Sequence, residues 1–273
     1  MKTITIAGGG LAGLSLGVAL RRHGVPAVVH EAGTYPRHRV CGEFISGVSR
    51  TTLEALGVES VHADARPHRS MQSSDGERPT LVADLPEPAL GISRHRLDAR
   101  LVSLLRSQGG VVHAAARREP VAREGLVWAA GRREDRERDR LGLPGHPAGV
   151  TPVADLAMHL GADGYAGLAR IEEGRVNVCG LFRRRKQRAK GPELLFSYLE
   201  ESGLASLAER LRRAGPDRGS FLGVTAFRLG PQSDPGALCA VGDAQSMIPP
   251  FTGNGMSMAF EAAESAVAPL VGT

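Results

Sequence analysis

Apolar positions near the N-terminus follow a strand–helix–strand order. Residues 3–7 are apolar and rich in β-branched side chains, which is typical of a buried parallel strand. Residues 11–23 place apolar side chains at helical spacing and end in three basic residues before Gly24. Residues 26–30 are again apolar and lead into Glu31. The pattern predicts a Rossmann-type βαβ unit and hence an α/β fold.

The periodicity changes in the second half of the chain. Residues 157–161 and 175–182 predict antiparallel strands around a turn at Asp163–Gly164. Residues 192–213 predict one or two amphipathic helices. Residues 237–241 then predict a buried strand, and a helix is expected from about 256 to 270. A smaller antiparallel sheet is therefore expected between two parts of the α/β domain.

A glycine motif joins the first strand to the first helix. Gly8, Gly10 and Gly13 satisfy GxGxxG, and Glu31 follows 18 residues after Gly13. The first glycine permits a tight turn, the second lets a pyrophosphate approach the backbone, and the third lets helix and strand pack closely. The helix N-terminus adds positive potential for phosphates, and the carboxylate suits ribose hydroxyls. The spacing predicts a dinucleotide site.

Two other patterns do not support a hydrolase or a metalloenzyme. Gly13–Gly17 matches GxSxG, but a nucleophile elbow needs its serine at a strand-to-helix turn, and Ser15 lies inside the predicted helix. The nine histidines show no HExxH and no other metal-ligand spacing, so no metal is expected.

A second strand–turn–helix pattern lies near the other end of the chain. Asp243 ends the predicted strand, where its carboxylate can accept hydrogen bonds from sugar or ribityl hydroxyls. Gly255 and Met256 begin the following helix, whose free N–H groups would favour electron density on the N1–C2=O edge of a flavin. An ordinary strand–turn–helix without a ligand is the alternative.

Composition narrows the class of protein. The net charge is +5, but the most basic run, residues 183–190, has no aromatic residue on which bases could stack, so we expect no nucleic-acid partner. Residues 3–20 are uncharged, yet their glycines make a poor membrane-spanning helix, and no transmembrane segment is expected. Three cysteines without CxxC spacing suggest a reducing compartment and predict a cytoplasmic location.

Together the two ends of the chain resemble a known group of flavoproteins. GGGLAG with Glu31, followed by GDA…PPFTGNG, is similar to the FAD-dependent oxidoreductases of the p-hydroxybenzoate hydroxylase fold. Residues 36–43 resemble a basic-x-Cys-Gly segment of the geranylgeranyl reductase branch, and residues 92–98 resemble the group's R-x-x-L-D helix start. The resemblance covers nearly the whole chain in the group's order. It implies FAD as the cofactor.

The resemblance also implies which residues contact FAD. Arg39 is a candidate for the pyrophosphate. Cys41 is expected either to pack beside the flavin or to take part in chemistry. The positions that match FAD-contacting ones are Ala12, Glu31, Cys41, Gly42, Arg94, Asp243, Gly255 and Met256. No catalytic residue is assigned, although His159 and Tyr165 are candidates for the lining of the substrate lobe.

Departures from the group's patterns limit the choice of reaction. The stretch 126–132 lacks the Asp before Gly131 that hydroxylases carry, which questions the use of NAD(P)H as electron donor. The single tryptophan, Trp128, excludes the WxWxIP motif of halogenases. The stretch 165–170 keeps Tyr165 but loses the rest of the prenyl reductase Tyr-x-Trp-x-Phe-Pro segment.

The sequence therefore predicts an FAD-dependent oxidoreductase, with a monooxygenase-like hydroxylation of a small organic or lipid-like substrate favoured. NAD(P)H or an electron-donor partner would reduce the flavin. One alternative is a flavin-dependent reductase or dehydrogenase of unsaturated bonds, similar to geranylgeranyl reductase. Another is a non-catalytic or truncated FAD-binding protein.

The FAD-contacting segments lie at both ends, so the two domains are expected to interleave. Residues 1–60, 88–150 and 235–273 are assigned to the FAD-binding domain, and residues 61–87 and 151–234 to the substrate lobe. The 273 residues are short for the group, whose members usually continue with further helices over the substrate pocket. A more open pocket, a partner subunit or lost activity would be the consequence.

Overall fold

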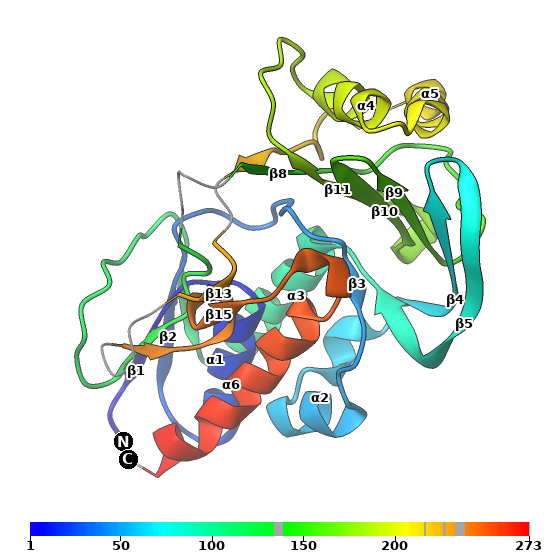
Figure 1. The fold of residues 1–273 in the computed structure, drawn as a ribbon. Helices are drawn as coiled ribbons and strands as arrows, with labels where there is room; N and C mark the ends of the chain where they lie inside the picture. The colour runs from blue at the N-terminus through cyan, green and yellow to red at the C-terminus, as the bar shows by residue number, and fades with distance from the viewer. Residues whose placement is uncertain (134–138, 216, 226–227, 233–237, 273) are drawn as a thin grey trace.

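Two lobes, each built on one large sheet, make up the protein (Figure 1). The computed structural model describes residues 1–133, 139–215, 217–225, 228–232 and 238–272. Residue 237 of the expected strand 237–241, and the expected domain boundary at 234/235, lie outside these ranges.

The first sheet is parallel throughout and has the order β14-β7-β1-β2-β6. Its strands are β1 (Ile4–Ala7), β2 (Ala27–His30), β6 (Val111–His113), β7 (Leu126–Trp128) and β14 (Cys239–Ala240). The helices of this lobe are α1 (Leu11–Arg22), α2 (Arg50–Leu56), α3 (Arg94–Ser107) and α6 (Gly255–Val271). The predicted βαβ unit of β1, α1 and β2 is confirmed.

Helix α1 is the centre of this lobe. It packs against α3 and α6, and all its residues from Leu11 to Leu20 are buried. A helix that is apolar all round is stable only inside a protein or a membrane, and the packing of α1 explains the uncharged stretch 3–20. Within the described part of the chain, no helix is long and apolar enough to cross a membrane.

The second sheet has eight strands in the order β12-β8-β11-β10-β9-β4-β5-β3. Its strands are β3 (Phe44–Ile45), β4 (Arg66–Asp75), β5 (Arg78–Gly91), β8 (Arg140–Gly145), β9 (Leu156–Gly161), β10 (Gly164–Arg170), β11 (Val176–Arg183) and β12 (Val224–Thr225). Helices α4 (Pro192–Glu201) and α5 (Ala205–Ala214) cover its outer face (Figure 1), where Phe182, Phe196 and Leu199 form part of a separate core.

Two expectations about this sheet are corrected. The turn at Asp163–Gly164 joins β9 to β10, so β10 separates β9 from β11 and pairs with both. The sheet is also mixed, because β4 pairs with β9 in parallel. These two strands belong to separate excursions of the chain, with α3, β6 and β7 between them, and a long crossover permits the parallel pairing that a hairpin does not.

The short elements complete the description. The 3₁₀ helices are η1 (Glu59–His62), η2 (Glu172–Gly174), η3 (Gly242–Ala244) and η4 (Pro250–Thr252), and a two-stranded sheet pairs β13 (Gly230–Pro231) with β15 (Ser246–Met247). Strands β5 and β8 of the second sheet extend into residues 88–91 and 140–145. The assignment of residues to two interleaved domains stays a prediction.

The basic run 183–190 lies at the surface between β11 and α4. Arg183 pairs with Asp139, and Arg185 pairs with Asp163 and Glu201. These exposed ion pairs match the interpretation of the run as a solvated surface.

Candidate functional site

A cleft of about 1300 Å³ runs along the ends of the parallel strands and continues onto the second sheet. Open α/β sheets bind ligands at the carboxyl ends of their strands. The predicted cofactor residues that line this cleft are Gly8, Gly10, Ala12, Glu31, Arg39, Cys41, Gly42, Arg94, Asp243, Gly255 and Met256. Gly13 is the predicted residue that does not line it.

The three motif glycines have separate roles in the structure. Gly8 has φ +118°, and a Cβ there would lie 2.1 Å from the carbonyl oxygen of Ala129. A Cβ on Gly13 would lie 2.0 Å from the carbonyl oxygen of Gly8, so this glycine is needed for the close packing of α1 on β1. A Cβ on Gly10 would meet nothing within 4 Å, because this position faces the cleft.

The N-terminus of α1 opens onto the cleft beside Gly10. Gly10 is the N-cap residue, and no side chain caps the helix. The unpaired N–H groups of a helix N-terminus and its dipole favour an anion. The open space at Gly10 and the uncapped helix together fit the pyrophosphate of a dinucleotide.

Glu31 lies at the end of β2, facing the same turn. Its carboxylate accepts hydrogen bonds from the N–H groups of Gly9 at 2.9 Å and Gly33 at 2.8 Å, and it pairs with Arg37 at 2.8 Å. Burial alone would raise the pKa of Glu31, but the hydrogen bonds and the neighbouring arginines lower it below its ordinary value. The carboxylate is therefore ionised at neutral pH, as an acceptor for ribose hydroxyls requires.

A buried carboxylate joins the two predicted cofactor arginines. Asp98 is fully buried and accepts from Arg39 Nε at 2.6 Å and from Arg94 Nε at 2.8 Å. Arg39 also donates to the carbonyl oxygen of Gly9 at 3.0 Å. The sequence marks Asp98 as part of the R-x-x-L-D segment without indicating a role for it. In the structure it holds both guanidinium groups at the wall of the cleft.

Cys41 lies at this wall against Met256. Its Sγ lies 3.4 Å from Met256 Sδ and accepts from the N–H of Glu43 at 3.4 Å. Burial raises the pKa of the Cys41 thiol, against the opposing charge of Arg94, so the thiol is protonated at neutral pH. The geometry favours the expectation that Cys41 packs beside a cofactor.

The second strand–turn–helix meets the first one across the cleft. Asp243 lies in η3, directly after Gly242, whose Cβ would lie 2.9 Å from Ala12 Cβ in α1. Burial raises the pKa of Asp243, and the charge of Arg94 opposes this shift. Helix α6 begins at Gly255 without a side-chain cap. Segments from the two ends of the sequence therefore face one space.

The part of the cleft beside the second sheet is mainly apolar. Tyr165 on β10 faces it, with its ring 5.2 Å from that of Phe251 in an edge contact. The other residues of this sheet that line the cleft are Phe44, Gly142, Cys179, Gly180, Leu181 and Val224, and Leu222, Met247 and Ile248 outside the sheet also line the cleft. His159, the second candidate for this lining, lies on β9 and is not part of the cleft wall.

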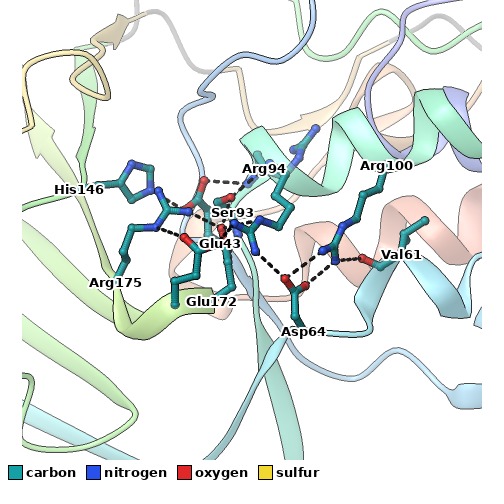
Figure 2. A network of polar contacts seen from close by, with 11 residues as sticks. Glu43, Val61, Asp64, Ser93, Arg94, Arg100, His146, Glu172 and Arg175 are labelled. Carbon is teal, nitrogen blue, oxygen red and sulfur yellow. Dashed lines mark hydrogen bonds and ion pairs between the residues drawn. The ribbon is translucent and has the colours of Figure 1, made fainter.

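A network of polar contacts around the start of α3 was not anticipated from the sequence (Figure 2). It contains Glu43, which is next to the noted Cys41–Gly42 pair, together with His146 and Glu172, for which the sequence holds no local pattern. Among the described residues, no group of three or more histidine, cysteine, aspartate or glutamate side chains could hold a metal ion.

The fold and the cleft define the class of dinucleotide-binding flavoproteins. Comparison with known proteins then identifies the family within this class. The profile of the family described as "FAD binding domain" matches residues 1–140. The chain therefore belongs to this family, whose cofactor is FAD, and shares the p-hydroxybenzoate hydroxylase fold. A search of curated proteins finds no match.

Solved structures agree on the fold. PqsL of P. aeruginosa in complex with 2-aminobenzoylacetate is 20% identical, with a TM-score of 0.75 over 99% of this chain and 86% of that one. The flavin-dependent brominase Bmp2 is 16% identical, with a TM-score of 0.75 over 99% and 80%. A point variant of Klebsiella pneumoniae HpxO complexed with FAD is 18% identical, with a TM-score of 0.72 over 100% and 82%. At these identities the likeness concerns the fold alone.

Proposed function

We propose that the protein is an FAD-dependent oxidoreductase with a monooxygenase-like reaction on a small organic or lipid-like substrate. The observation that carries the proposal is the continuity of the cleft from the glycine turn and Glu31 to the apolar wall around Tyr165. Single-ligand pockets measure about 300–1,000 Å³. The cleft of about 1300 Å³ has room for a cofactor and a second molecule.

The residues of the wall suit separate parts of FAD. The α1 N-terminus at Gly10 would bind the pyrophosphate, with Arg39 and Arg94 nearby as cations. Glu31 would bind ribose, and Asp243 would bind ribityl hydroxyls. The remaining site assignments, Ala12, Cys41, Gly42, Gly255 and Met256, would pack against the flavin or present backbone groups to it.

FAD supplies the redox chemistry when bound, and the protein supplies orientation and a dry wall. The apolar residues around Tyr165 and Leu181 would keep water away from the substrate side once FAD and substrate fill the cleft.

The electron donor is part of the proposal. NAD(P)H and a separate donor protein both remain candidates, because Ala130 stands where hydroxylases of this fold carry an aspartate before the glycine. We expect the protein to act in the cytoplasm on a small molecule, without a nucleic-acid partner.

A flavin-dependent reductase of unsaturated bonds is the second candidate. The Cys41–Gly42 segment, which resembles the reductase branch, faces the cleft together with Tyr165, and this observation favours it. A non-catalytic FAD-binding protein is the third.

The test begins with the spectrum of the purified protein. Titration of the FAD-free protein with FAD should produce a bound-flavin spectrum with one equivalent per chain, and failure to bind FAD would refute the proposal. Anaerobic addition of NADPH, and then of a reductase with NADPH, distinguishes the two electron donors. Reduced protein mixed with air in the presence of aromatic or lipid-like compounds should give a hydroxylated product. Product formation from an unsaturated compound without oxygen would favour the reductase instead.

A further inference from the structure

Glu43 has an unusual backbone for its residue type. It is 1% exposed and has φ 54°, in the left-handed region that favours glycine. Such a conformation persists in a non-glycine residue only where the surroundings hold it in place. A side chain at this position therefore has a role that glycine could not fill.

The carboxylate of Glu43 connects two segments of the chain (Figure 2). Oε1 accepts from the backbone N–H of Arg94, the first residue of α3, at 2.8 Å. Oε2 accepts from His146 Nε2 at 2.7 Å. The main chain of Glu43 adds a hydrogen bond from its N–H to Cys41 Sγ and accepts one from the N–H of Ile92 at 3.2 Å.

The second sheet holds the same segment at a second point. His146 directly follows β8, and Gly145 pairs with Val178 of β11. The neighbouring Asn177, 1% exposed, donates from Nδ2 to the carbonyl oxygen of Cys41 at 2.9 Å. The buried side chains of His146 and Asn177, at the same end of the adjacent strands β8 and β11, thus fix residues 41–43.

Neither Glu43 nor His146 lines the cleft, whereas Cys41, Gly42 and Arg94 do. We infer that Glu43 is a positioning residue that, through His146, ties the cofactor-facing segments 41–42 and 94 to the substrate lobe. The inference rests on the proposed function, because it takes these segments to face FAD.

The start of α3 is held in the same way from η2. Glu172, 2% exposed, accepts from the N–H of Ser93 at 2.8 Å and from its hydroxyl at 2.6 Å. Ser93 Oγ in turn accepts from the N–H of Arg96. Two buried carboxylates from outside the helix therefore bind the N–H groups of its N-cap residue and of its first residue, which fixes the place of Arg94 relative to both lobes.

The test compares four variants with the wild-type protein. Glu43→Ala removes the carboxylate, and Glu43→Gly removes it while relieving the left-handed backbone. Glu43→Gln keeps the shape and an acceptor for the N–H of Arg94. His146→Phe removes the partner and keeps a ring. The matched control is His68→Phe, because His68 is fully buried in the second sheet and its side chain hydrogen bonds to the carbonyl oxygen of Arg170 at 2.6 Å. Phenylalanine keeps a ring to stack on Phe44, as the ring of His68 does.

We expect Glu43→Ala, Glu43→Gly and His146→Phe to raise the Kd for FAD about tenfold or more, because small displacements of a site are costly. Their bound-flavin absorption maxima should also shift. Glu43→Gln and His68→Phe should stay within about threefold of wild type. Equal Kd values and spectra for His146→Phe and His68→Phe would overturn the inference, as would full recovery in Glu43→Gly.

Hydrogen exchange of the FAD-free protein separates this inference from the proposed function. Peptides that cover residues 41–43 and 93–96 should exchange about tenfold faster in His146→Phe than in His68→Phe. Unchanged exchange in these peptides would overturn the positioning role even if FAD binds. Faster exchange in a protein that binds no FAD would refute the proposed function and the cofactor part of the inference, and would leave the link between the lobes standing.

Discussion

Replacing Gly13 by alanine should disrupt the contact between α1 and β1. The new Cβ would lie 2.0 Å from the carbonyl oxygen of Gly8, whereas ordinary contacts begin at 3.4 Å. The backbone of α1 fixes the position of the Cβ, and the oxygen belongs to the main chain, so a change of rotamer cannot relieve the strain. Helix and strand would have to separate by more than an ångström, across the most buried part of the first lobe.

The magnitude follows from two opposing effects. Alanine in a helix interior is more favourable than glycine by about 1 kcal/mol. Overpacking a core costs about 1–3 kcal/mol and exceeds this range where the backbone must move. We therefore expect Gly13→Ala to lower the free energy of unfolding by about 2 kcal/mol or more, which corresponds to a decrease in Tm of about 5 °C.

Gly17→Ala is the matched control, four residues later in the same helix. Its Cβ would lie 3.1 Å from Leu105 Cδ2, the end of a flexible side chain. The Tm of each variant is measured by circular dichroism on the FAD-free protein, because bound FAD would raise Tm by an amount that depends on each variant's Kd. Gly17→Ala should melt within about 2 °C of wild type. A Gly13→Ala protein as stable as Gly17→Ala would refute the steric argument.

Three further predictions address the cofactor wall and the pH dependence. Gly10→Ala places a methyl group in the open space of the cleft where the pyrophosphate is proposed to bind. FAD titration should therefore give a Kd raised about tenfold, with little change in the Tm of the FAD-free protein. A Kd within about twofold of wild type would contradict the placement of the pyrophosphate. Asp98→Asn removes the negative charge between Arg39 and Arg94. Urea unfolding should show that the free energy of unfolding falls by about 3 kcal/mol, and FAD should bind more weakly. An unchanged urea midpoint would contradict this prediction. Burial, with a smaller effect of Arg210, lowers the pKa of His159 from 6.5 to about 4, so the unfolded chain takes up the proton first and stability falls from about pH 6.5 to pH 4. After allowance for the partial exposure of His159, His159→Gln should reduce this pH-dependent loss of stability by about 1–2 kcal/mol. The measurement is the difference in urea midpoint between about pH 7 and pH 4.5 for each protein. The same pH dependence in the variant and the wild type would argue against burial as the cause.

Local patterns carried the prediction of the cofactor side. The turn between β1 and α1, the carboxylate at Glu31 and the start of α6 each lie within one short unit of chain. Hydrophobic periodicity and glycine positions encode such units, because their contacts are close in sequence. The order of strands in the second sheet was less accessible, and β10 was missed as a strand between β9 and β11.

The sequence by itself determined the βαβ unit, the family resemblance and a set of candidate cofactor residues, of which all but Gly13 line the cleft. Only the tertiary structure decided how the lobes are joined. Glu43 and His146 are 103 residues apart, and Arg39 and Asp98 are 59 apart, so no local period relates them. The Arg39–Asp98 pair forms when α3 packs in the first lobe, and the Glu43–His146 pair forms when the end of β8 meets the segment before α3. In both places a buried charged or polar group must find a partner.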